Sequence, residues 1–156
     1  MSDLNSIVQV AVKEELKHAV KLKETAGRLK HPVLKALLEG IAKDSEKHSL
    51  FYQAILDFLN KVSPMLTEKE LEILKASIEE HLEVEAKMIR LAKEWSGKVE
   101  DSRLKMILWA IHEDELKHHK LLEDIRDKIA KRETFTENDF WDAVWKDSPW
   151  HGTPGG

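Results

Sequence analysis

Cysteine is absent from this chain of 156 residues. Its absence excludes disulfides, thiolate metal sites and thiol catalysis. The chain does hold 8 His and 29 Asp plus Glu residues, which are then its strongest metal-ligating side chains. Any metal site must therefore be built from imidazole and carboxylate groups.

Glycine and proline are scarce as well, with 6 and 4 residues, as is common in helical proteins. No apolar run approaches the length of a membrane span, and the N-terminus shows no basic and apolar signal segment. The formal charge of -4 comes from interspersed signs, without a basic patch for nucleic acid or a membrane surface. We therefore expect one soluble, cytoplasmic domain with neither a nucleic-acid nor a membrane partner.

Four long segments carry apolar residues at alternating steps of three and four, the spacing of a core-facing helical stripe. They run from about 2 to 27, 32 to 62, 68 to 97 and 102 to 129. Pro32 suits a first helical turn, and Thr67 with Glu70 forms a capping box before the third segment. Short connections favour an all-α fold with a four-helix bundle over residues 1–131. We expect residues 132–156 to form a short aromatic helix and an extended tail.

The fourth segment places polar residues on its apolar stripe. The stripe is formed by Leu104, Leu108, Ile111, Leu122, Ile125 and Ile129. Continuing its steps through the gap puts Glu115 and His118 on the same face. Burying such groups without partners costs roughly 2–7 kcal/mol each. A bound metal ion is the leading explanation, and a buried hydrogen-bonded network without metal is the alternative.

The chain also repeats itself at an offset of 70 residues. The repeat pairs Leu34 with Leu104, Ile41 with Ile111, Asp44 with Asp114, Lys47 with Lys117 and His48 with His118. A repeat of this length is one helical hairpin, so we expect two related hairpins. The same offset places Glu15 on Glu85, whereas the neighbouring Glu14 falls on Val84. The expected inward polar set is therefore Glu15, His48, Glu85, Glu115 and His118.

This set resembles the ferritin-like di-metal carboxylate bundles, in which a Glu from each of two helices joins a Glu-x-x-His motif from each of the other two. Within that superfamily the chain is most similar to the erythrin branch, related to rubrerythrin, over roughly residues 3–131. The resemblance implies that Glu15 and Glu85 are terminal ligands and that Glu115 bridges two metals. It also implies that His48 and His118 each bind one metal.

The resemblance further implies a chemistry. A di-iron site is the expected cofactor, with manganese or zinc as alternatives. The expected substrate is hydrogen peroxide or dioxygen, as in rubrerythrin-like peroxidases and ferroxidases. A rubredoxin module requires four cysteines, which the chain lacks. Electrons would therefore come from an external donor or from substrate iron.

One position departs from this pattern. Where the repeat requires the Glu of the first Glu-x-x-His motif, the chain has Ser45, which carries no charge to neutralise a second divalent ion. A non-catalytic bundle with a degenerate single-metal or structural site is therefore the alternative function. His81, four residues before Glu85, is the candidate replacement ligand, and His18 is a weaker one. For both, a histidine bonded to backbone or water is the alternative. The His81-x-x-x-Glu85 spacing also resembles hemerythrin-like helices, but that family does not explain the repeat.

The connector between the second and third segments is short. In a ferritin-like topology helices one and three run antiparallel, so the connector must return along the bundle. Residues 62–66 reach under ~18 Å when fully extended. Three arrangements are compatible with so short a connector: one helix ends early, the four helices follow a simple up-down-up-down order, or the hairpins exchange between two chains. We expect a homodimer, with hairpin exchange as a low-cost way to form it.

Overall fold

The computed structural model describes residues 2–61 and 66–130. These residues form four long helices, α1 (Ser2–Gly27), α2 (Pro32–Asn60), α3 (Glu68–Lys98) and α4 (Ser102–Ile125), and a short π-helix, η1 (Arg126–Ala130), that continues α4. No strand occurs within these two described ranges. The predicted all-α class and four helices are confirmed. The expected aromatic helix and tail at 132–156 lie outside the described residues.

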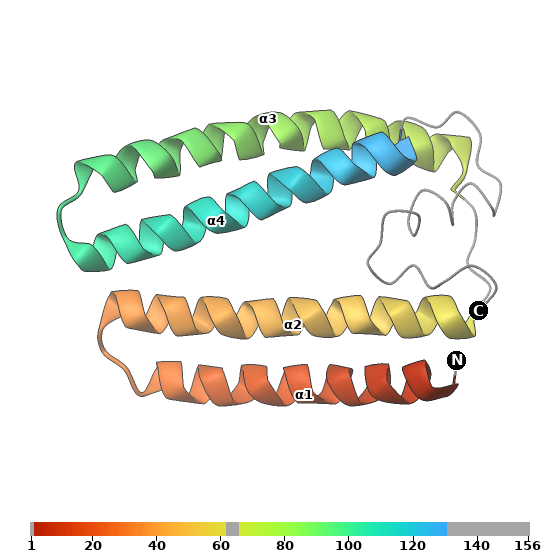
Figure 1. Cartoon of the computed structure of the whole chain (residues 1–156), viewed down its shortest axis with the longest axis horizontal. Helices are drawn as coiled ribbons and strands as arrows, with labels where there is room; N and C mark the ends of the chain where they lie inside the picture. The colour runs from red at the N-terminus through yellow and green to blue at the C-terminus, as the bar shows by residue number, and fades with distance from the viewer. Residues whose placement is uncertain (1, 62–65, 131–156) are drawn as a thin grey trace. The chain divides into compact units, whose positions relative to one another are not determined.

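The helices form two antiparallel hairpins, in which α1 packs against α2 and α3 packs against α4 (Figure 1). This division of the chain into two helical hairpins agrees with the two related hairpins that the 70-residue repeat predicts. Their pairing into one ferritin-like four-helix bundle stays a prediction. Within the described residues, no helix is both long enough and apolar enough to cross a membrane.

Local signals in the sequence set the helix ends. Thr67 Oγ1 accepts a hydrogen bond from the Glu70 amide at 3.1 Å, and the Thr67 amide donates to Glu70 Oε2 at 2.9 Å. This reciprocal pair is the predicted capping box at the start of α3. Asp101 caps α4 in a related way, accepting from the Arg103 amide at 2.8 Å. The start of α3, and with it the register of Glu85, is therefore fixed by a local interaction.

The apolar core of the α3/α4 hairpin contains few residues. Leu71, Ile78 and Leu82 of α3 are buried, and three partly buried side chains pack against them: Leu74, Leu122 and Ile125. Leu82 and Leu122 lie one turn from Glu85 and His118, respectively. The apolar core therefore borders the candidate site.

The α1/α2 hairpin has a seam of small side chains. Its buried residues are Val8, Ala19, Ala26, Ala42, Ser45 and Ser49. The Ser49 hydroxyl donates to the Glu46 carbonyl oxygen at 2.7 Å, so its polar group is satisfied within α2. Small residues let two helices approach closely but bury little apolar area, so this hairpin too has little core of its own.

Several positions that the sequence predicts to face inward are exposed in the hairpins. Leu34, Ile41, Leu104 and Ile111 are each exposed by more than a third. The apolar stripe on each helix is wider than a single neighbouring helix covers. Each hairpin thus presents an apolar face beyond the contact between its own two helices.

Candidate metal centre

The candidate centre is built from one residue of α3 and two residues of α4. Glu115 and His118 are three residues apart on α4, so they lie on one face of the helix, one above the other. Glu85 faces them from the middle of α3. The packing of α3 on α4 brings Glu85 to the two residues that the sequence placed together on the stripe of the other helix.

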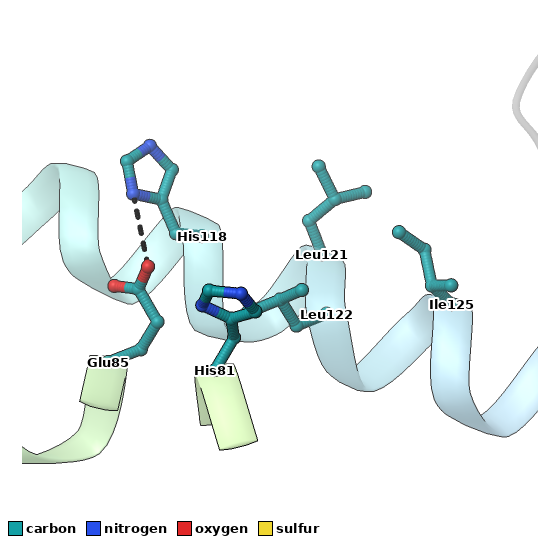
Figure 2. A pocket seen from close by; sticks show the side chains of 6 residues that line it. All are labelled: His81, Glu85, His118, Leu121, Leu122 and Ile125. Carbon is teal, nitrogen blue, oxygen red and sulfur yellow. Dashed lines mark ion pairs between the residues drawn. The ribbon is translucent and has the colours of Figure 1, made fainter. Parts of the chain in front are cut away.

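The ligand atoms of these residues converge. One ligand atom of each of Glu85, Glu115 and His118 lies within 4.8 Å of the other two. His118 Nδ1 is 3.5 Å from Glu115 Oε2 and 3.7 Å from Glu85 Oε1 (Figure 2 marks the second contact). In the described part of the chain, no other three His, Asp or Glu side chains converge in this way.

The Glu85 carboxylate is in an unfavourable environment without a cation. Its side chain is only 19% exposed, and its Oε2 atom is buried without a hydrogen-bond partner among the described residues. Hydrogen bonding with the Glu115 carboxyl raises the pKa of Glu85, and burial and the charge of Glu115 raise it further. The positive charges of His118 and His81 lower it by less. A divalent cation would neutralise both carboxylates and use the unpartnered oxygen, so the residues present fit a metal ion.

His81 lies beside this group rather than within it. A pocket of about 270 Å³ is lined by His81, Glu85, His118, Leu121, Leu122 and Ile125. Figure 2 shows His81 and Glu85 extending from α3 toward the same space. His81 is not part of the three-residue cluster and its side chain is exposed. Its role as a ligand stays a prediction.

The α1/α2 hairpin repeats part of this arrangement. Glu15 Oε1 is 3.5 Å from His48 Nδ1, which corresponds to the pair of Glu85 and His118. Glu15 also lines a pocket with Ala11, Glu14, His18 and Tyr52. Ser45, at the position of Glu115, is buried in the seam with 4% of its surface exposed. This hairpin therefore offers two matched ligands where α3/α4 offers three.

Two other histidines of α4 lie next to carboxylates of the same helix. His119 Nδ1 is 2.6 Å from Glu123 Oε1, and His112 Nδ1 is 3.8 Å from Glu113 Oε1. Both histidines are half-buried. Each is paired along its own helix, so neither belongs to the candidate centre.

Comparisons with protein-family models, curated proteins and solved structures find no match to this chain. The ferritin-like interpretation therefore depends on the residues themselves: the repeat, the Glu-x-x-His motif and the cluster around Glu85.

Proposed function

We propose that the α3/α4 hairpin binds a divalent transition-metal ion through Glu85, Glu115 and His118. The observation that supports this most directly is the meeting of two carboxylates and an imidazole around a buried Glu85 oxygen that lacks a partner. A set of oxygen and nitrogen ligands without sulfur suits Fe²⁺ or Mn²⁺, and Zn²⁺ also accepts it. Iron is our first choice because the ligand pattern resembles that of di-iron carboxylate bundles.

We further propose that the protein is a ferritin-like oxidoreductase of the rubrerythrin type. Bound iron or manganese would exchange electrons with hydrogen peroxide or dioxygen. Glu85 and Glu115 supply the negative charge that balances the ion, and His118 supplies a neutral donor. The pocket beside His81 gives a small molecule access to two of the ligands, Glu85 and His118. With no cysteine in the chain, the electrons come from an external donor or from substrate iron.

A second candidate function follows from Ser45. The α1/α2 hairpin holds only Glu15 and His48 at matched positions, and a buried serine takes the place of the third ligand. In this alternative the cluster in α3/α4 holds a single structural ion and turns over no substrate.

Metal analysis together with a peroxide assay separates the two candidates. We expect purified protein to contain iron or manganese by inductively coupled plasma mass spectrometry, and the iron-loaded protein to consume hydrogen peroxide. Glu85→Gln should lose both properties. Glu123→Gln is the matched control, because it makes the same change at a carboxylate of α4 that pairs with His119 outside the cluster. Bound zinc without peroxide turnover would favour the structural candidate, and absence of any bound metal would contradict both.

A further inference from the structure

The candidate centre contains half of a recognisable ligand set. Di-metal carboxylate bundles use a Glu from each of two helices and a Glu-x-x-His motif from each of two others. The α3/α4 hairpin supplies one of each kind, Glu85 on α3 and Glu115 with His118 on α4. The α1/α2 hairpin does not supply the other half, because Ser45 replaces the required Glu. A second copy of α3/α4 would supply it in full.

Charge balance gives the same answer. Two divalent ions carry four positive charges, and two copies of Glu85 and Glu115 carry four negative ones. A set that used Glu15 with one copy of Glu85 and Glu115 would carry only three. An uncompensated charge in a low-dielectric site is costly, so the symmetric set holds two ions better.

The ligands of α3/α4 open onto an apolar face that the hairpin itself leaves uncovered. On α4, Leu104, Ile111 and His118 follow at intervals of seven residues, which keeps them on one side of the helix. The two apolar residues are exposed, and the His118 side chain itself is 48% exposed. A face with apolar residues along it and a ligand at one end has the form of an interface that is completed by another helical layer.

On α3 the uncovered face continues beside Glu85. Val84, Leu91 and Trp95 follow at intervals of seven and four residues, and all three are exposed. Val84 is adjacent to the ligand in sequence. Because α3 and α4 run antiparallel, Leu91 and Trp95 lie on the same side of the ligand cluster as the exposed residues of α4, and together they extend the apolar face from the ligands toward the connection between the two helices.

The connector limits which hairpin can complete the set in a ferritin-like orientation. α2 continues 12 residues from His48 to Asn60, and α3 runs 17 residues from Glu68 to Glu85. At 1.5 Å per residue these stretches are ~18 Å and ~26 Å long. A connector that runs back along both stretches of helix would have to span about 44 Å, whereas the eight residue steps from Asn60 to Glu68 extend at most ~29 Å. An oppositely oriented hairpin is therefore more readily supplied by a second chain.

We propose that two copies of the chain associate through their α3 and α4 faces, so that Glu85, Glu115 and His118 of each copy form one two-fold symmetric, two-metal centre. This inference rests on the proposed metal binding in α3/α4. The contact is isologous, since the same residues face each other from both copies. Metal binding and dimer formation are then coupled, because each chain alone holds an incomplete site.

Solution measurements on the full-length protein test this inference. Analytical ultracentrifugation should show a dimer with one bound metal per chain. Chelation should raise the dimer dissociation constant roughly tenfold or more, because metal that binds only the dimer stabilises it by mass action. With Mn²⁺ as the probe, electron paramagnetic resonance should show an exchange-coupled pair and not the six-line signal of an isolated ion. A monomer that binds Mn²⁺ with an isolated six-line signal would overturn the inference and leave the metal site in place.

Variants at repeat-related positions provide the matched controls. His118→Ala and Glu115→Gln should lose the exchange-coupled signal, while His48→Ala should keep it. His48 and His118 occupy equivalent positions of the repeat and are similarly exposed. Loss of the coupled signal in His48→Ala would overturn the symmetric centre, and loss of all metal from the unaltered protein would overturn the proposed function as well. Circular dichroism verifies that each variant retains its helical content.

Discussion

At the scale of single residues, the centre depends on one carboxylate that is costly to bury. Glu85 approaches Glu115 in a partly desolvated position, and one of its oxygens has no hydrogen-bond partner among the described residues. Binding of either a proton or a cation would remove the unfavourable negative charge between Glu85 and Glu115. Protons and metal ions therefore compete for the same group, and metal affinity should fall as the pH is lowered.

Glu85 predicts a pH dependence of stability in the metal-free protein. Its pKa is raised from the ordinary value of 4.5 because of hydrogen bonding with Glu115 and burial. Between the ordinary and the raised pKa, the folded chain binds more protons than the unfolded chain. The free energy of unfolding therefore falls as the pH rises through this interval. Below pH 4.5 both states are protonated at this residue and the stabilisation is fully present.

Urea unfolding in the presence of a chelator, followed from pH 4.5 to 7, measures this dependence. Glu85→Gln should show a smaller loss of stability over the interval, since its amide does not ionise. Glu123→Gln serves as the control, because it removes a carboxylate that pairs with His119 away from the cluster. If the slope of Glu85→Gln equalled that of the unaltered protein, the assignment to Glu85 would be wrong.

The second prediction at this scale concerns His81. His81 shares a pocket with Glu85 and His118, so its replacement should weaken metal binding even if it acts only from the second coordination sphere. We expect His81→Ala to lower metal affinity roughly tenfold to a hundredfold, the range for residues that support metal ligands. Isothermal titration with Mn²⁺ measures the change, with His112→Ala as the control. Unchanged affinity and stoichiometry would mean that His81 is a boundary histidine without a metal role.

At the scale of helices, the sequence predicts best what local interactions determine. The start of α3 follows from the contact between Thr67 and Glu70, and Pro32 marks the start of α2. Helical periodicity is enough to predict Glu115 and His118, because it places them on one face. The repeat predicts Glu85, whose carboxylate does approach His118. The exposure of Ile111 was not predictable from the sequence, because an apolar stripe does not specify which neighbour covers it.

Ser45 offers a test of the repeat at the level of a helix pair. Ser45→Glu would place a carboxylate in the α1/α2 seam near Glu15 and His48, in the position that Glu115 has in α3/α4. In metal-free protein we expect the free energy of unfolding to fall by roughly 3 kcal/mol, because a buried charge lacks compensation. Added Mn²⁺ should restore much of this loss and raise the metal content.

Ser45→Gln is the control for that experiment, since it has nearly the same size and no charge. It should be destabilised without metal rescue. Equal behaviour of the two variants with and without Mn²⁺ would show that the equivalence between the hairpins does not extend to metal binding. Chemical denaturation and metal analysis of the two proteins, measured side by side, provide both readouts.

At the scale of the whole molecule, the two hairpins have too little core to account for their own stability. No large apolar side chain in the described ranges is completely buried, and many are exposed. An isolated pair of helices buries too little area to offset the conformational entropy of ordering it. Further helices that cover these faces would supply the missing apolar burial, and in the proposed two-metal centre a second α3/α4 hairpin does so with a matching ligand set.

Two positions of α4 separate an interface effect from a general surface effect. Ile111 and Leu116 are similarly exposed, at 39% and 41%, but they lie on different sides of the helix. Ile111 shares the face of His118, whereas Leu116 follows five residues later and points about 140° away from it. A charged side chain should therefore disturb the dimer at the first position and be tolerated at the second.

We expect Ile111→Lys to raise the dimer dissociation constant roughly a hundredfold or more, because it buries an unpaired charge in both halves of a symmetric contact. Leu116→Lys should leave the dimer unchanged, and both variants should keep their helical circular dichroism. Sedimentation equilibrium measures the constants, with and without metal. Because the proposed two-metal centre requires both copies, Ile111→Lys should also lose the exchange-coupled manganese signal while its own three ligand residues remain intact. A variant that dissociates but keeps the coupled signal would show that the two ions are held within one chain.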